Sequence, residues 1–180
     1  MDGLLFDSER IVQRSWEIAG DELGIPHMGD VIYHTLGMNR AGRNEYFRKY
    51  IREDFPFEEF GKLTRDNFWK IVDKEGLPLK KGVKELLAYG KSQGYKMAVA
   101  TSSSREYAMG NLIRAGIDSY FDSVVCGDMV KKAKPDPEIY IYTMKKMGVE
   151  PKDCYVVEDS TFGLQAAESA GTVVICKRDD

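Results

Sequence analysis

The sequence predicts an α/β fold in which a parallel sheet is combined with a separate block of helices. From Lys96 onward, short runs rich in Val and Ile alternate with stretches of helical periodicity, and this alternation is typical of parallel strands joined by crossover helices. Residues 8–76 lack any strand-like run and place apolar residues at helical spacing. The 180 residues, 43% of them hydrophobic, can bury the core of one domain that carries a small insertion.

Four apolar runs are expected to form the strands of the sheet. They are "KMAVA", "SVVCG", "CYVVE" and "TVVICK". Each run is short and apolar without alternating polar residues, which indicates a strand that is buried on both faces.

Helices are expected between these strands, with starts near Ser103, Pro135 and Thr161. Ser103 can cap the first of them, and Glu106 can reach back to complete a capping box. The prolines in "KPDPEIY" mark the first turn of the second helix.

The helical block between residues 8 and 76 is expected to contain roughly four helices, separated by breaks at "LGIPHMGD", "LGMNRAG" and "EDFPFEEF". A further helix near residues 82–92 would lead the chain into the sheet. The inward face of the first helix of the block is expected to be Ile11, Ser15, Trp16, Ala19 and Leu23. The inward face of the helix near residues 82–92 is expected to be Val83, Leu86 and Leu87.

Composition excludes several classes of partner. The formal charge of −3, with acids and bases interleaved, leaves no basic patch suited to nucleic acid. Cys126, Cys154 and Cys176 show no metal-ligand spacing, so we expect buried, inert thiols in a reducing compartment. No apolar stretch approaches the ~20 residues that span a bilayer, and there is no signal-peptide pattern. We therefore expect a cytoplasmic protein without nucleic-acid or membrane partners. A monomer is expected by default, since no sequence feature decides the oligomeric state.

Polar residues follow the predicted strands at the edge where parallel sheets bind their ligands. Thr101, Ser102 and Ser103 come directly after "MAVA" and before a helix, so that hydroxyl groups and free helix N–H groups can face one bound anion. Lys134 stands just before another helix, in "KKAKPDP". Together these residues favour a phosphoryl group at this edge.

Carboxylates are expected at the same edge. Glu158 and Asp159 end the strand in "CYVVEDSTFG", and "MDGLLFD" contributes Asp2. Paired carboxylates at a strand end can hold a hard cation such as magnesium. Taken singly, each signal also fits a helix cap, a solvated charge or a turn. Their common position at one edge of the sheet favours a site for a phosphoryl group and a magnesium ion.

Four segments that contain these residues resemble the motifs of the haloacid dehalogenase superfamily. They are "MDGLLFDSE", "MAVATSSS", "GDMVKKAKPDPEIY" and "VVEDSTFGLQAAESAG", and the match runs from Asp2 to about Lys177. The subgroup that they resemble contains small phosphatases and phosphomutases, beta-phosphoglucomutase among them. The resemblance implies a Rossmann-like core formed by residues 1–7 and 77–180, with residues 8–76 inserted as a helical cap.

The resemblance also implies catalytic roles. Asp2 would be the general acid and base, and Lys134 would neutralise the charge of the phosphoryl group. Thr101 would hydrogen-bond that group, assisted by the amide of Ser102, with Ser103 beside it as a further substrate contact. For magnesium, the implied ligands are Asp159 and Asp2, with Glu158 either a ligand or an outer-shell partner.

Two cap residues are expected to contact the substrate. Arg40, in "LGMNR", matches a cap arginine that binds a second phosphate in related mutases, although an exposed loop arginine fits equally well. Trp16 lies in the first cap helix. Related mutases carry a His four residues before this Trp, and Val12 stands there in this chain. This difference favours hydrolysis over a mutase reaction.

The nucleophile of the family falls outside the sequence. In the resembling motif a strand ends in Asp-x-Asp-Gly and the first Asp attacks phosphorus. Met1 occupies the x position, so that this Asp and its central strand would precede Met1, and the family usually continues past "TVVICKRDD". Either flanking residues of a normal enzyme are missing or the protein is a catalytically dead homologue. The intact remaining motifs favour the first explanation, and the 180-residue chain by itself is expected to be inactive.

The expected function is therefore that of a magnesium-dependent phosphatase acting on a small phosphorylated metabolite such as a sugar phosphate. Two alternatives stay open. One is a phosphomutase similar to beta-phosphoglucomutase. The other is a pseudo-phosphatase that binds a phosphorylated ligand or a protein partner without turnover.

Overall fold

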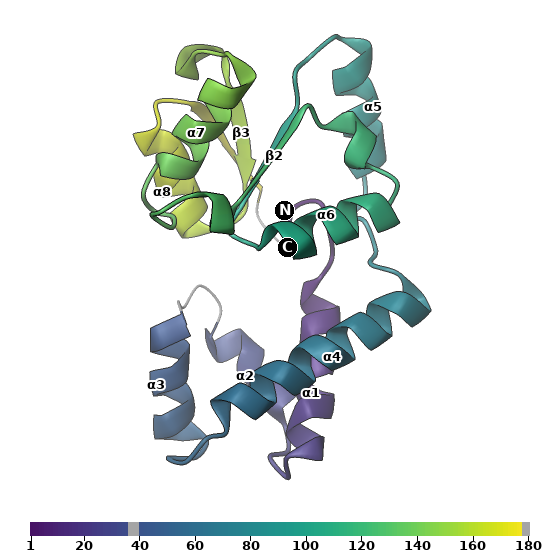
Figure 1. The fold of residues 1–180 in the computed structure, drawn as a ribbon, viewed down its shortest axis with the longest axis vertical. Coiled ribbons are helices and arrows are strands. Elements are labelled where there is room, and N and C mark those ends of the chain that lie inside the picture. The colour runs from purple at the N-terminus through teal and green to yellow at the C-terminus, as the bar shows by residue number, and fades with distance from the viewer. Residues whose placement is uncertain (36–39, 178–180) are drawn as a thin grey trace. The chain divides into compact units, whose positions relative to one another are not determined.

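A computed structural model describes residues 1–35 and 40–177, and the chain divides into two compact units. Unit 1 consists of Met1–Asp7 and Leu77–Asp180, and unit 2 consists of Ser8–Gly76. Figure 1 shows the strands in unit 1 and the helices α1 to α4 in unit 2. These bounds coincide with the division expected from the sequence.

Unit 2 is helical throughout its described residues. Its helices are α1 (Glu9–Glu22), α2 (Met28–Thr35), α3 (Arg40–Tyr50) and α4 (Phe57–Glu75), which confirms the expected helical block. Helix α1 packs against both α2 and α4. The predicted inward face of α1 is buried, apart from Leu23, which is only partly covered at the end of the helix.

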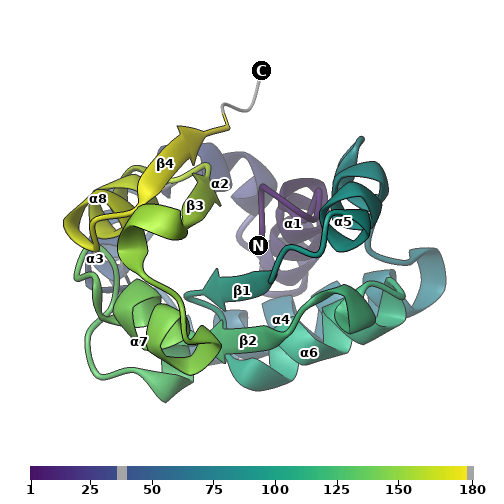
Figure 2. The same ribbon diagram turned by 90° about the horizontal axis from the view of Figure 1, so that it is seen from above.

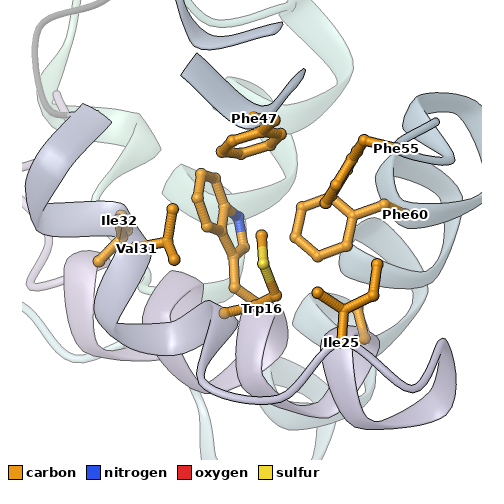
Figure 3. Packing of buried hydrophobic residues seen from close by; sticks show 9 residues of the cluster. Trp16, Ile25, Val31, Ile32, Phe47, Phe55 and Phe60 are labelled. Atoms are coloured by element: carbon orange, nitrogen blue, oxygen red, sulfur yellow. The ribbon is translucent and has the colours of Figure 1, made fainter. Parts of the chain in front are cut away.

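The core of unit 2 is built from aromatic rings. Figure 3 shows Trp16 of α1 beside Phe47 and Phe60. The ring centroids of these two pairs are 5.6 and 5.5 Å apart, and both pairs meet edge to face. Phe55 joins the cluster at 4.7 Å from Phe47. Because rings that meet edge to face are attractive beyond their burial, this cluster fixes the packing of the helices in unit 2.

Unit 1 contains the predicted strands β1 (Ala98–Thr101), β2 (Ser123–Cys126), β3 (Tyr155–Glu158) and β4 (Val173–Cys176). β1 pairs with β2, and β3 pairs with β4, in parallel in both cases. The strands therefore form two two-stranded sheets in place of one continuous sheet. In the part of the chain that the structure describes, no strand lies between β1 and β3 to join them (Figure 2).

The helices of unit 1 are α5 (Val83–Ser92), α6 (Arg105–Arg114), α7 (Glu138–Met147) and α8 (Thr161–Ser169), and short 3-10 turns lie at Asp118–Tyr120, Gly127–Met129 and Pro151–Asp153. Two predicted starts need correction. α6 is capped by Ser104, which accepts from the Tyr107 N–H, and not by Ser103. α7 begins only at Glu138, after Pro137. In α5, Leu86 is exposed while its neighbour Leu87 faces inward.

Helices α7 and α8 cover both pairs of strands with one apolar cluster. Its buried members are Val125, Ile139, Tyr140, Met144, Ala166, Ala167 and Ala170, and Ala100, Val156 and Val174 pack against them. Since Ala100 belongs to β1 and Val156 to β3, the cluster holds the two sheets in one unit.

Burial is less complete than the apolar runs predict. Tyr155 in β3 is 72% exposed and Ile175 in β4 is 48% exposed, so the prediction of strands buried on both faces is wrong for these two strands. The prediction of buried thiols is confirmed for Cys126. It is wrong for Cys154, which is partly buried, and for Cys176 at the end of β4, which is exposed. Within the described residues, no helix is long and apolar enough to cross a bilayer.

Candidate active site

Four separate segments of unit 1 meet at the ends of β1 and β3. The hydroxyl of Ser103, just after β1, donates to Asp2 Oδ2 at 3.0 Å. Lys134 Nζ donates to the carbonyl of Ala100 in β1 at 3.3 Å and also to the carboxylate of Glu158, the last residue of β3. The four sequence segments singled out for their polar residues thus lie together.

The central feature of this region is a buried ion pair between Lys134 and Glu158. The two side chains are only 9% and 8% exposed. Lys134 Nζ also donates to the Tyr140 hydroxyl at 2.9 Å, and the Tyr140 hydroxyl donates to Glu158 Oε1 at 2.6 Å. The ammonium group and the phenol therefore converge on one carboxylate oxygen.

The second oxygen of Glu158 is held by the start of α8. Oε2 accepts from the Ser160 hydroxyl at 3.1 Å and from the N–H groups of Asp159 and Ser160 at 3.3 and 3.4 Å. Ser160 also caps α8, because its hydroxyl oxygen accepts from the Gly163 N–H at 3.1 Å. Both oxygens of Glu158 are thus satisfied by groups of the protein.

Electrostatics keep this carboxylate ionised. Burial by itself would raise the pKa of Glu158, but the charge of Lys134 and the hydrogen bonds from Lys134 and Tyr140 lower it to about 2. Burial and the hydrogen bond to Glu158 both raise the pKa of the Tyr140 phenol. At neutral pH, Glu158 is therefore charged and Tyr140 is a neutral donor.

Asp2 is oriented by two hydroxyl groups. Its Oδ2 accepts from Ser103, and its Oδ1 accepts from the Tyr107 hydroxyl at 2.9 Å. Thr101, buried at the end of β1, accepts the Ser103 N–H at 3.2 Å. The loop after β1 thereby holds both a carboxylate and a hydroxyl near the end of the strand.

The backbone nitrogen of Met1 lies where the charges of the site converge. The carboxylates of Asp2, Glu158 and Asp159 and the ammonium group of Lys134 all lie within electrostatic reach of this nitrogen. Three carboxylates and one ammonium group therefore gather around the start of the Asp2 segment.

The carboxylates of this region fit magnesium better than a metal ion whose ligands all come from the protein. Among the described residues, no cluster of three or more His, Cys, Asp or Glu side chains is arranged to hold a metal ion. Magnesium needs only one or two carboxylates, because waters and substrate oxygens complete its shell. Asp2 and Asp159 can supply those carboxylates, whereas Glu158 is already engaged by Lys134, Tyr140 and Ser160.

Two other predicted site residues lie differently, and a third has a side chain outside the described residues. Ser102 is exposed, and its carbonyl oxygen lies against Gly127 so closely that a side chain at position 127 would collide with it. Trp16 belongs to the aromatic core of unit 2, 6% exposed, and this placement favours a packing role over a contact with substrate. Arg40 begins α3, but its side chain lies outside the described residues.

Sequence reasoning missed three residues of this region, namely Tyr107, Tyr140 and Gly163. Lys134 and Tyr140 are the first and the last residue of "KPDPEIY", and Tyr140 lies on α7. The closeness of the two residues in the sequence was a signal that Tyr140 could contact Lys134. Tyr107 lies in the first turn of α6, next to the serine-rich loop. A phenol close to predicted charged residues could have been proposed as a hydrogen-bond donor to them.

The fold and the site together define a class of protein: parallel strands with crossover helices, a helical unit inserted near the start of the chain, and opposite charges gathered at strand ends. The model of the haloacid dehalogenase-like hydrolases matches residues 1–177. The chain belongs to that family, in the subgroup of beta-phosphoglucomutase and CbbY.

The relatives found by comparison agree with this assignment. A phosphorylated carbohydrates phosphatase of Thermotoga maritima is 34% identical over 171 residues, which is 95% of this chain and 79% of the relative. The crystal structure of a candidate beta-phosphoglucomutase from the same organism has a TM-score of 0.82 and 31% identity, covering 100% of this chain and 85% of that one. CbbY from Rhodobacter sphaeroides, solved in complex with phosphate, has a TM-score of 0.79 and 25% identity, covering 100% and 84%.

Proposed function

We propose that this protein is a magnesium-dependent phosphatase that hydrolyses a small phosphomonoester such as a sugar phosphate. The observation that carries the proposal is the buried Lys134–Glu158 pair at the ends of β1 and β3, with Asp2 and Asp159 beside it. Membership of a hydrolase family and the 34% identity to a phosphatase of phosphorylated carbohydrates support it.

Phosphoryl transfer depends mainly on positioning and on electrostatic stabilisation. Lys134 would place positive charge beside the transferring group, and Glu158 would hold the ammonium group there. Thr101 would hydrogen-bond a phosphoryl oxygen from the end of β1. Magnesium, held by the Asp159 carboxylate, would supply further positive charge when bound, and Asp2 is assigned to proton transfer instead, because a carboxylate bound to magnesium cannot act as a general acid.

Asp2 would move the protons of the reaction. Protonated, it would give its proton to the oxygen of the leaving alcohol as the phosphorus–oxygen bond breaks. In the second half of the reaction its carboxylate would take a proton from the attacking water. The hydroxyls of Ser103 and Tyr107 would keep this carboxyl group in place through both steps.

The covalent step of this proposal needs one further carboxylate. In the family's reaction an aspartate two positions before the general acid attacks phosphorus and forms an aspartyl-phosphate, which water then hydrolyses. That position precedes Met1. A polypeptide limited to residues 1–180 is therefore proposed to bind phosphorylated ligands without turnover, and turnover is assigned to a protein that carries the preceding aspartate.

Intact mass and phosphatase activity of one purified sample test the proposal. The mass shows whether the sample extends beyond the 20.4 kDa of residues 1–180. The activity is measured on a panel of sugar phosphates with magnesium and again after chelation. Hydrolysis that stops on chelation and that Lys134→Met abolishes is the expected result for a longer protein.

Two other outcomes are informative. A sample of 20.4 kDa that binds inorganic phosphate but does not hydrolyse any substrate would favour the pseudo-phosphatase alternative. A sample that carries the preceding aspartate but neither binds phosphate nor hydrolyses any sugar phosphate would overturn the proposed function.

A further inference from the structure

We propose that Tyr140 is a positioning residue whose hydroxyl shares the charge of Glu158 with Lys134 and so leaves the Lys134 ammonium group able to turn to a phosphate. This inference rests on the proposed function, because it assumes that an anion binds beside Lys134. It is carried by the contacts of the three side chains.

The Lys134 ammonium group has three N–H donors, and the structure gives it three acceptors within the protein. These acceptors are the Ala100 carbonyl at 3.3 Å, the Tyr140 hydroxyl at 2.9 Å and Glu158 Oε1. An incoming phosphate oxygen must therefore replace one of these acceptors. The bond to Ala100 is longer than the bond to Tyr140, and it joins the ammonium group to an uncharged carbonyl.

The ion pair with Glu158 opposes any movement of the ammonium group toward a phosphate, because a buried carboxylate that loses a donor is costly. Tyr140 lowers that cost. Its hydroxyl donates to Glu158 Oε1 at 2.6 Å while it accepts from Lys134. The Ser160 hydroxyl and the N–H groups of Asp159 and Ser160 donate to Oε2. With the Tyr140 hydroxyl on Oε1, both oxygens of Glu158 therefore keep hydrogen-bond donors when Lys134 moves toward a phosphate.

Without the Tyr140 hydroxyl, Lys134 would be the one side-chain donor on Oε1 of Glu158 among the described residues. The substitution also removes an acceptor of the ammonium group, but that acceptor is uncharged. The ammonium group would be drawn more strongly to the charged carboxylate, and less of its charge would be offered to the ligand. The expected consequence is weaker binding of phosphate, with the fold unchanged.

The ring of Tyr140 makes a separate contribution that a phenylalanine would keep. It packs in the buried cluster of α7 and α8, and its centroid lies 4.7 Å from Lys134 Nζ. Tyr140→Phe therefore removes only the hydroxyl and keeps both the packing and the cation–π contact. Tyr142 lies on the same helix and is 41% exposed, so Tyr142→Phe is a matched control.

The test is the binding of inorganic phosphate, in the presence of magnesium, to the wild type and to both variants by titration calorimetry. Loss of one hydrogen bond in a charged network predicts about a tenfold higher Kd for Tyr140→Phe. Tyr142→Phe should bind as the wild type does. In a sample that turns over, KM should rise with kcat nearly unchanged, because the lost interaction acts on substrate and transition state alike.

Each other outcome overturns one claim. Wild-type or higher affinity in a folded Tyr140→Phe protein overturns the role of Tyr140 and leaves the proposed function standing. A wild type that does not bind phosphate overturns the proposed function and this inference with it. If Tyr140→Phe does not fold in buffer alone, phosphate binding of this variant and of the wild type is measured in trimethylamine N-oxide, which stabilises folded states. A variant that binds phosphate there as tightly as the wild type, or more tightly, would contradict the inference.

Discussion

Gly163 in α8 lies directly against the carboxylate of Glu158, so that a Cβ at position 163 would overlap the carboxyl carbon and both oxygens. The same turn carries Ser160, whose hydroxyl donates to Glu158 and accepts from the Gly163 N–H. The first turn of α8 is thus closed around the buried carboxylate. The residue at position 163 has to lack a side chain because the space is already filled.

Gly163→Ala is therefore expected to destabilise the protein by about 1–3 kcal/mol, the usual cost of overpacking a buried position. Helix propensity alone would predict that the substitution stabilises the protein by about 1 kcal/mol. Urea unfolding measures the difference. The control is Gly61→Ala in α4, where an added Cβ would meet only Arg65 Nη1 at 3.6 Å, and a gain of about 0.5–1 kcal/mol is expected. Equal stabilisation by both substitutions would show that Glu158 is not held as described.

Stability should fall in acid because of Glu158. Its pKa is lowered from 4.5 to about 2 in the folded state, so its contribution is complete above pH 4.5 and is lost as the pH falls toward 2. The shift corresponds to about 3 kcal/mol for this buried side chain. The free energy of unfolding of the wild type, measured by urea at several pH values with a chelator present, is expected to decline over that window.

Two variants distinguish the contribution of Glu158 to the acid dependence of stability from that of the other carboxylates. Glu158→Gln leaves Lys134 buried without its counter-charge, which should cost about 3–5 kcal/mol at pH 7 and flatten the decline between pH 4.5 and 2. Glu168→Gln, at an exposed position of α8, should keep the wild-type profile. A Glu158→Gln profile parallel to that of the wild type would contradict the lowered pKa.

Local sequence patterns were sufficient to predict most of the secondary structure. The four apolar runs and the helical spacing of residues 8–76 correspond to the observed strands and helices, because periodicity and chain breaks act over a few residues. The cap of α6 was misplaced by one residue. Ser103 and Ser104 are adjacent and chemically identical, and only the distant Asp2 shows that Ser103 is used elsewhere.

Features that depend on distant partners could not be predicted in this way. Tyr107 and Asp2 are 105 residues apart in the sequence, and Tyr140 and Glu158 are 18 apart. The exposure of Tyr155 likewise depends on what covers β3, which the apolar run itself does not encode. Predictions from pattern therefore gave the elements and the charged residues, whereas the hydroxyls that orient those charges required the structure.

Trp16 is expected to stabilise unit 2. Because it is 6% exposed and meets Phe47 and Phe60 edge to face, Trp16→Ala should cost about 3–5 kcal/mol. Circular dichroism during urea unfolding measures this loss. Tyr33→Ala, which removes an exposed ring of the same unit, should cost far less. A Trp16→Ala protein as stable as the wild type, with weaker phosphate binding, would instead support the substrate contact predicted from the sequence.

Magnesium affinity tests the assignment of Asp159. Removal of a carboxylate ligand should raise the Kd for magnesium by at least the 10–100-fold that is typical for residues supporting a metal site. Titration calorimetry of Asp159→Asn and the wild type measures this change. Asp153→Asn, at an exposed position before β3, is the control and should bind magnesium normally. Unchanged affinity in Asp159→Asn would remove this residue from the proposed ligand set.

Tyr107 should affect the proton-transfer steps and not the binding of substrate. Its hydroxyl donates to Asp2 Oδ1 at 2.9 Å, so Tyr107→Phe leaves the acid–base carboxyl group with less control of its orientation. In a sample that turns over, we expect kcat to fall by about tenfold, within the 10²–10⁴-fold contributed by a positioned acid or base, while KM stays unchanged. Asp2→Asn should lose the whole of that larger factor.

The double variant separates a direct role of Tyr107 from one exerted through Asp2. If the phenol acts only by orienting Asp2, Tyr107→Phe should have no further effect on kcat once Asp2 is replaced by Asn. This pattern is opposite to the one expected for Tyr140→Phe, where KM rises and kcat is nearly constant. Equal changes in KM for both tyrosine variants would mean that neither hydroxyl acts on a particular charged group, and that both serve the packing of unit 1.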